Sequence, residues 1–484
     1  MKKFLGVLAL GTAVLGGALA TGVLRSASRQ IAVAPAAPIQ IDVDTAAQRL
    51  SHAIRHRTVA PVDSASQAEF ERFQDFLSGS FPALHKRLAR ETVSQHSLLY
   101  TWQGSDPKLK PILLMAHMDV VPIDPASEQS WTHPPFSGQI AGGFIWGRGA
   151  MDDKASVMAI LEAVEHLLNN GFQPARTIYL AFGHDEEIGG HDGAANIAAT
   201  LAARNVQLEY VLDEGMNILS GIIDGVAAPV ALVGIAEKGY LSVELSAAAA
   251  GGHSSIPTQD NAIGRINRAL QRLEATPFPA KLRGPTRAMF DYLGPEMTGI
   301  NKIALTNLWL FEPMIANKLA KSPLTDAILR TTMAPTFFNA GVKENILPTQ
   351  ARAVINLRIM PGESTASALE HVRRAIDDPQ VKLTPLAIRM EPSAVTDSDS
   401  SSFKLVERTI RQTMPEAVVA PSLLVAATDS RHYAGLTKNV LRFLPITLTA
   451  ADTKRYHGID ERIAVSDYLR CINFYAQLIK NSQP

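Results

Sequence analysis

The feature that most constrains the fold is an alternation of short apolar runs with segments of helical periodicity. Residues 111–116 and 177–182 are apolar runs with the length of buried strands, whereas residues 156–168 repeat apolar side chains at helical spacing. Strands that are buried on both faces and alternate with helices form parallel sheets. The sequence therefore predicts an α/β fold with a mostly parallel central sheet flanked by helices.

The pattern changes near residue 237. After this point the order of strand-like and helix-like segments predicts a small α+β unit, built from residues 240–248, 261–273, 351–360, 364–376 and 381–389. Between its halves, residues 276–329 are Pro-punctuated and partly helical, and they are too long for an ordinary loop. We expect an insertion with its own packing role.

The length of 484 residues exceeds what one hydrophobic core usually holds, so we expect more than one domain. The predicted main domain has two parts, residues 45–236 and 392–484. Residues 237–391 form the inserted α+β domain, which contains the helical insertion 276–329.

The N-terminus predicts export. Lys2 and Lys3 precede an uncharged run over residues 4–24, so residues 1–25 form either a signal peptide or a membrane anchor. Cleavage would leave a secreted or periplasmic protein, and an uncleaved segment would hold the protein on a membrane. Residues 26–44 are expected to be a linker between this segment and the folded body.

Composition restricts the partner. Lys plus Arg and Asp plus Glu both total 46, and no basic run is present, so nucleic acid is excluded as the main partner. We expect a small-molecule partner instead. The single cysteine, Cys471, cannot form an intramolecular disulfide and cannot supply a structural Cys-rich zinc site.

Residues of the types that bind divalent metals stand at the ends of predicted strands and in loops, namely His117, Asp152, Glu187, Asp213 and His457. Imidazole and carboxylate ligands without a thiolate suit zinc, manganese or cobalt. Such a set predicts a catalytic site for two cations, with Asp152 as the bridging ligand. The alternative for Asp152 is a helix N-cap, a role that Asp153 can also fill.

Two further acids have predicted roles beside these ligands. Side chains two positions apart on an extended segment face the same way, so Asp119 can accept the outer N–H of His117. Glu186 and Glu187 cannot share one orientation, so Glu187 can bind metal while Glu186 acts as general acid and base. The alternatives are a polar strand end at His117 and a solvated acidic loop at Glu186.

Together these residues carry a family resemblance. The ordered segments resemble the M20 metallopeptidases over about residues 45–480, with matches at His117, Gly147-Arg148-Gly149-Ala150-Met151-Asp152-Asp153-Lys154, Asp185-Glu186-Glu187, Asp213-Glu214-Gly215, Gly252-His253-Ser254-Ser255 and His457. Within that family, the sequence around Glu237, Arg358 and Thr428-Asp429-Ser430-Arg431 is most similar to the carboxypeptidase S and PM20D1 branch.

The resemblance implies a role for each residue. One zinc ion would be held by His117, Asp152 and Asp213, and the other by Asp152, Glu187 and His457, with cobalt or manganese as alternative metals. The inserted domain would be the lid of the family, which also mediates homodimers in some members. His253 would donate to the developing oxyanion, although its residue pattern alone favours a helix-entry position.

The resemblance also implies a function. Members of this branch hydrolyse dipeptides or N-acyl amino acids, and some run the reverse condensation. Arg358, Asn345 and Arg431 are candidates to bind the free carboxylate of such a substrate, and each could instead be a structural ion-pair partner. Two other functions are an N-acyl amino acid deacylase or synthase and a non-catalytic metal-binding protein on the same fold. The latter would normally lack Glu186 or a ligand.

Overall fold

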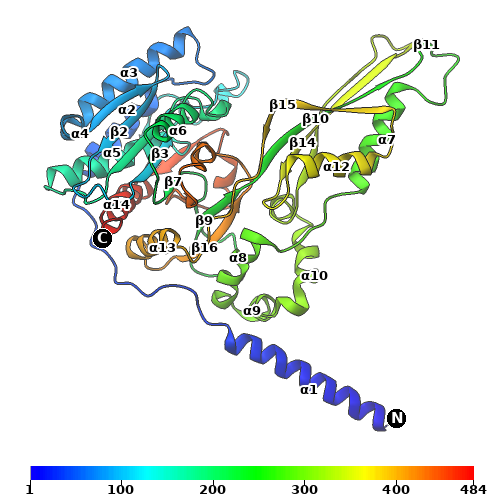
Figure 1. Cartoon of the computed structure of the whole chain (residues 1–484), viewed down its shortest axis with the longest axis horizontal. Coiled ribbons are helices and arrows are strands. Elements are labelled where there is room, and N and C mark those ends of the chain that lie inside the picture. Colours follow the sequence, from blue (N-terminus) through cyan, green and yellow to red (C-terminus); the bar gives the residue numbers. More distant parts are fainter. Residues whose placement is uncertain (1) are drawn as a thin grey trace.

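The computed structural model describes residues 2–484, and its larger sheet has a parallel centre (Figure 1). Strands β6, β3, β7 and β17 lie side by side and run in the same direction. The ten strands of this sheet are β1 (Ala89–Val93), β2 (Ser97–Trp102), β6 (Ile178–Gly183), β3 (Ile112–His117), β7 (Val211–Asp213), β17 (Val440–Arg442), β9 (Val230–Glu237), β8 (Ile218–Leu219), β18 (Thr447–Leu448) and β16 (Val418–Leu424).

Strand β3 is buried on both faces of this sheet. Leu113 and Met115 pack in a cluster with helix α6 (Ala194–Ala203), whereas Leu114 and Ala116 pack in the larger core with helices on the opposite face. Those helices are α2 (Val43–Arg55), α5 (Lys154–Asn169), α13 (Ser401–Thr413) and α14 (Val465–Asn481). Since a strand covered on both sides needs a continuous apolar sequence, the predicted α/β fold is confirmed.

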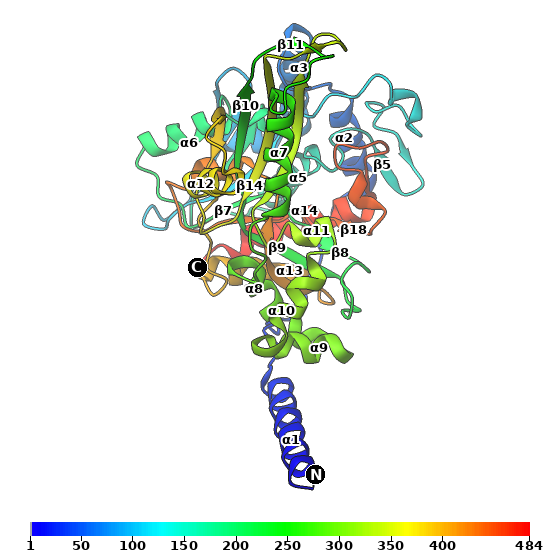
Figure 2. The same ribbon diagram turned by 90° about the vertical axis from the view of Figure 1, so that its right-hand side faces the viewer.

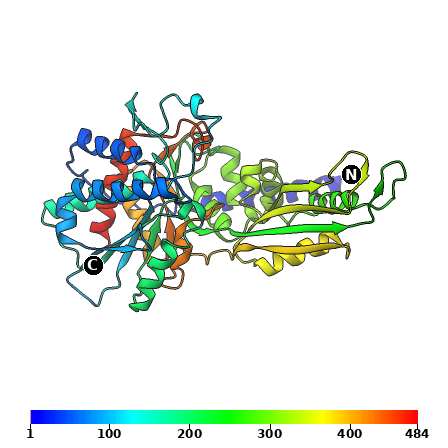
Figure 3. The same cartoon turned by 90° about the horizontal axis from the view of Figure 1, so that it is seen from above.

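The second sheet has four antiparallel strands and its own apolar core. Its order is β12 (Thr332–Ala340), β14 (Gln350–Ile359), β10 (Gly239–Ala248) and β15 (Val381–Met390), and helices α7 (Ala262–Ala275) and α12 (Thr365–Ile376) pack against it. Figure 3 shows this unit extending away from the larger sheet. The domain boundaries stay a prediction, because a separate sheet does not show that a unit folds alone.

The segment predicted as a helical insertion contains α8 (Gly284–Leu293), α9 (Gly299–Thr306), α10 (Leu308–Leu319) and α11 (Pro323–Asp326). Helix α1 (Lys2–Arg25) projects away from the body beside α9 (Figures 1 and 2). Among residues 2–484, no helix combines the length and the apolar character needed to cross a membrane.

The remaining elements are helix α3 (Ser64–Ser80), which contributes Phe70, Phe73 and Leu77 to the larger core, and several short segments. The short segments are α4 (Pro82–Arg87), η1 (Glu128–Ser130), β4 (Ile140–Ala141), β5 (Phe144–Trp146), η2 (Glu186–Ile188), β11 (Gly252–His253), η3 (Gly294–Glu296), β13 (Ile346–Leu347), η4 (Asp429–Tyr433), η5 (Asp452–Lys454) and β19 (Arg462–Ala464).

A buried ion pair fixes the point where the chain passes from one sheet to the other. Glu237 ends β9 and its Oε2 accepts from Arg442 Nε at 3.1 Å, from the Thr428 N–H at 3.0 Å and from the Thr428 hydroxyl at 3.2 Å. Glu237 and Arg442 are both buried. This carboxylate therefore connects β9, β17 and the turn that leads into η4.

Replacement of Glu237 with Gln should destabilise the chain strongly. The Arg442 guanidinium would stay buried without its counter-charge, and breaking a buried pair typically costs about 3–5 kcal/mol. Urea unfolding measures the effect. The control is Glu91→Gln, which breaks the exposed pair with Arg204 and should cost less than about 1 kcal/mol. Equal effects of the two variants would contradict this role.

Candidate metal centre

The carboxyl ends of three neighbouring parallel strands bring the predicted ligands to one edge of the sheet. His117 is the last residue of β3, Asp213 is the last residue of β7, and Glu186 and Glu187 follow β6 in η2. The register sets His117 opposite Gly183 of β6. Polar groups separated by long stretches of sequence therefore meet where the buried strands end.

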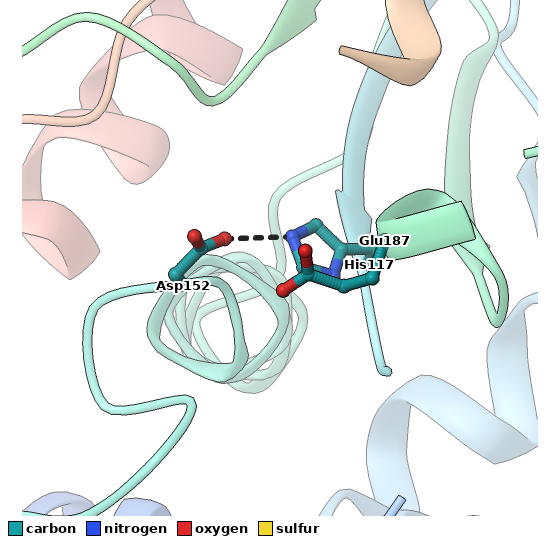
Figure 4. A group of neighbouring side chains, drawn as sticks. All are labelled: His117, Asp152 and Glu187. Carbon is teal, nitrogen blue, oxygen red and sulfur yellow. Dashed lines mark hydrogen bonds and ion pairs between the residues drawn. The ribbon is translucent and has the colours of Figure 1, made fainter. Parts of the chain in front are cut away.

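His117, Asp152 and Glu187 form a group that can hold a metal ion. One ligand atom from each lies within 4.8 Å of the others, and His117 Nε2 is 2.9 Å from Asp152 Oδ1 (Figure 4). His457 Nε2 adds a fourth donor, at 3.2 Å from both Asp152 Oδ2 and Glu187 Oε2. The structure thus brings four of the five predicted ligands together.

Asp213 lies outside this compact group. Its two carboxylate oxygens each accept a backbone N–H at 2.9 Å, one from Glu214 and one from Ser430. An ionised carboxylate has about four lone-pair sites, so these bonds leave room for a cation. The role of Asp213 as a ligand stays a prediction.

Asp119 holds both the histidine and the acidic turn. The carboxylate is fully buried, and its Oδ1 is 3.3 Å from His117 Nδ1, which also lies 3.0 Å from the Asp119 backbone carbonyl oxygen. It also accepts the backbone N–H of Glu186 at 3.2 Å and of Glu187 at 3.0 Å. This geometry directs His117 Nε2 toward Asp152. It also adds a contact with η2 that the sequence did not reveal.

Glu461 is a second supporting carboxylate, which no sequence motif predicted. This buried side chain accepts the backbone N–H of Met151 at 2.8 Å and of Asp152 at 3.2 Å, and it pairs with Arg148 at 2.6 Å. Arg148 also donates to the His457 carbonyl oxygen at 3.0 Å. Burial raises the pKa of Glu461 to about 7, although the Arg148 guanidinium opposes this shift. The pair joins the Asp152 turn to the His457 loop.

The electrostatics of the group favour a cation. Hydrogen bonds to Asp152 and Glu187 raise the pKa of the His457 imidazole to about 10. Burial lowers the pKa of His117, but the Asp119 and Asp152 carboxylates outweigh burial and raise it well above its ordinary value. Glu187 Oε1 is buried and has no hydrogen-bond partner among residues 2–484. Since carboxylates that stabilise a positive charge on two imidazoles can also stabilise a divalent ion, the residues present fit a metal.

Glu186 lies next to the group but takes no part in it. Its backbone is fixed by Asp119, and its side chain is half-buried. Burial, with the nearby Asp429 and Glu187 charges, raises the pKa of its carboxyl well above the ordinary range. A carboxyl with a raised pKa can accept a proton and release it near neutral pH, as a general acid and base must.

Two candidates lie far from the metal group. His253 is in β11 and Asn345 precedes β13, and these two strands form a separate two-stranded sheet at the outer end of the four-stranded one (Figures 1 and 2). His253 is exposed and its Nδ1 is 2.7 Å from the Ser255 hydroxyl, while the Asn345 carbonyl accepts the Ser254 N–H at 3.1 Å. The structure does not bring them to the site, so their roles stay predictions.

The two candidate arginines differ in their contacts. The Arg431 guanidinium donates to the Gly189 carbonyl at 2.7 Å and to the Thr428 carbonyl at 2.9 Å, so it supports the loop that follows Glu187. Arg358 instead lies over the Tyr240 ring at 4.9 Å, and within residues 2–484 no carboxylate pairs with it. Burial lowers the pKa of Arg358. The role of Arg358 in binding a substrate carboxylate stays a prediction.

Comparison with known proteins identifies the family. The model of Peptidase family M20/M25/M40 matches residues 113–481, a span that includes every predicted metal ligand. This chain belongs to peptidase family M20. The family assignment makes it a metal-dependent hydrolase, and it confirms the predicted family and enzyme class.

Individual relatives cover most of this M20 chain. A probable carboxypeptidase S-like 2 from Dictyostelium discoideum is 45% identical, over 96% of this chain and 91% of its own length. The mouse N-fatty-acyl-amino acid synthase/hydrolase PM20D1 is 41% identical, over 87% of this chain and 84% of its own length.

A solved M20 structure shares the fold. The M20 metallo-carboxypeptidase Sso-CP2 from Sulfolobus solfataricus superimposes with a TM-score of 0.66 at 17% identity, and the match covers 90% of this chain and 99% of that one. At this identity the comparison supports the fold alone.

Replacement of Asp119 with Asn should weaken zinc binding. The asparagine amide carries no negative charge, so it would pair less strongly with His117 and with the two N–H groups of η2. Loss of such a supporting partner typically costs 10- to 100-fold in metal affinity. Competition with a chelator measures the affinity.

The matched control is Asp185→Asn. Asp185 also accepts two backbone N–H groups, but from Asp192 and Gly193 rather than from the acidic turn. The zinc affinity of the Asp185→Asn variant should stay near that of the unsubstituted protein. Equal losses in the two variants would show that Asp119 acts only through general stability.

Zinc binding should release about two protons at neutral pH, because His117 and His457 carry raised pKa values without metal and must be neutral to bind it. Affinity should therefore fall as the pH is lowered. Calorimetric titration in buffers of different ionisation enthalpy counts the protons. His457→Ala should release one fewer, and release of no protons would contradict the predicted ligand set.

Proposed function

We propose that this protein hydrolyses the amide bond of N-acyl amino acids or dipeptides that carry a free carboxylate. The observation that supports this function is the convergence of His117, Asp152, Glu187 and His457 beside the carboxyl of Glu186. A group of metal ligands with an adjacent proton acceptor is what amide hydrolysis by an activated water requires.

Two divalent cations complete the proposed site. His117, Asp152 and Asp213 would hold one, and Asp152, Glu187 and His457 would hold the other. Zinc is the metal we propose, with cobalt or manganese as alternatives, because all donors are imidazole nitrogens or carboxylate oxygens. When bound, such cations supply Lewis acidity toward water and toward the scissile carbonyl.

Glu186 moves the proton in the proposed reaction. Its carboxylate accepts a proton from the attacking water while the water oxygen bonds to the carbonyl carbon. It then gives this proton to the nitrogen as the carbon–nitrogen bond breaks. The products are a carboxylic acid and an amine, and the raised pKa of Glu186 suits both transfers. Asp119 keeps the Glu186 backbone in place throughout.

The names of the relatives support the substrate class. One relative is named a probable carboxypeptidase and another an N-fatty-acyl-amino acid synthase/hydrolase. Both names describe an acyl group joined through an amide to an amino acid with a free carboxylate. The reverse condensation is a second proposed activity, because it uses the same bonds and the second name includes it.

Replacement of Glu186 with Gln should remove most turnover and keep the metal. The amide has nearly the shape of the carboxyl but cannot shuttle the proton, so kcat should fall by about 10²- to 10⁴-fold. Activity assays and metal analysis on the same sample measure the two effects. Unchanged turnover would remove Glu186 from its proposed role.

A substrate panel tests the substrate class and the carboxylate site together. Long-chain N-acyl amino acids, N-acetyl amino acids and dipeptides should be hydrolysed, whereas analogues with an amide in place of the carboxylate should be poor substrates. Arg358→Met should lower kcat/KM for the carboxylate forms by about 10- to 100-fold, the effect of losing one charged partner. It should change the amide forms little.

Arg431→Met is the matched control, because its guanidinium already donates to two backbone carbonyls. If Arg358→Met lowered kcat/KM equally for the carboxylate and the amide substrates, Arg358 would not recognise the carboxylate. No hydrolysis of any amide in the panel by the metal-loaded protein would overturn the proposed function.

We also propose that the protein is exported, on the basis of the uncharged segment over residues 4–24 that follows Lys2 and Lys3. Fractionation of the native cells tests this localisation. Recovery of the protein only from the cytoplasm would contradict it.

A further inference from the structure

Helices α9, α10 and α11 carry large apolar side chains that the rest of the described chain leaves uncovered. Ile300 is 78% exposed, Trp309 is 66% exposed, Met314 is 57% exposed and Leu324 is 66% exposed. Ile303 and Leu310 belong to the same stretch. We refer to these six residues as the apolar surface. Such a concentration within one short segment indicates a contact with an apolar partner.

Helix α1 leaves the body at this surface. The Asn307 amide, between α9 and α10, donates to the Leu19 carbonyl of α1 at 3.2 Å, and Gly22 lies against the Asn307 side chain. Figures 1 and 2 show α1 projecting outward from this point. The sequence from Phe4 to Leu24 contains no charged residue. An uncharged segment of this length suits an apolar environment.

The segment that follows α1 is fixed to the body. Gln30 forms two hydrogen bonds with the backbone of Val419, from its Nε2 to the carbonyl at 2.8 Å and from the Val419 N–H to its Oε1 at 2.7 Å. The Arg29 guanidinium lies 5.2 Å from the centre of the Tyr292 ring, on α8. The predicted linker therefore holds α1 next to the apolar surface.

We propose that the apolar surface lies on a lipid bilayer, with α1 entering the same leaflet beside it. The two features are continuous, because α1 leaves the body next to the apolar surface. Trp309 is of the residue type that favours the boundary between headgroups and acyl chains. Lys318 and Lys321 follow on the same insertion and suit anionic headgroups. The proposal requires contact with one leaflet only.

The fluorescence of the full chain with vesicles tests the proposal. The chain has four tryptophans, and Trp102, Trp131 and Trp146 are buried, with exposed fractions of 1%, 8% and 8%. A change at the exposed tryptophan therefore reports Trp309. Vesicles of phosphatidylcholine and phosphatidylglycerol should shift its emission to the blue, and brominated acyl chains should quench it. Trp309→Phe should lose both signals.

A second measurement separates the apolar surface from α1. The double variant Ile300→Ser and Met314→Ser should bind vesicles about tenfold more weakly, because two large side chains no longer leave water for lipid. The matched control is Val342→Ser with Ile388→Ser, two exposed apolar residues on the second sheet and its loop. This control should bind as the unsubstituted chain does.

Three outcomes would overturn the proposal. The chain could bind vesicles while Trp309 stays in water, which would assign binding to α1 alone. It could fail to bind vesicles at all. It could bury Trp309 without lipid in a concentration-dependent manner, with a doubled mass in light scattering, which would make a second copy the partner.

Discussion

The main constraint on this structure is the repulsion among acidic groups that the fold brings together with little water around them. Asp119, Asp152, Glu186 and Glu187 lie at one edge of the central sheet, and among the described residues of this group only His117 and His457 supply positive charge. Carboxylates in this arrangement repel one another unless cations neutralise them. Metal binding thus offsets an unfavourable interaction that the fold itself creates, which explains why the fold and the site depend on each other.

Two buried carboxylates keep this crowded group in order, and neither has to bind metal. Asp119 accepts two N–H groups from the acidic turn, and Glu461 accepts two from the turn that carries Asp152. Arg148 extends the second support to the His457 loop. A ligand held through its backbone keeps its position when the charge of its side chain changes.

The sequence predicted those strands and site residues whose positions follow from a local pattern of apolar and polar side chains. The apolar run over residues 111–116 corresponds to β3, and the polar residues after such runs reach the site because parallel strands end at one edge. It did not reveal strand β12, whose residues are mostly exposed and lack a buried face. Nor did it reveal Glu461, because that role depends on a partner more than 300 positions away in the sequence. The place of His253 likewise depends on how the second sheet is oriented.

Anomalous diffraction from crystals soaked with zinc would locate the cations. We expect density for bound metal beside the Asp152 carboxylate, with one ion near His117 and another near Glu187 and His457. Zinc bound elsewhere, with no density within coordination distance of Asp152, would contradict this expectation.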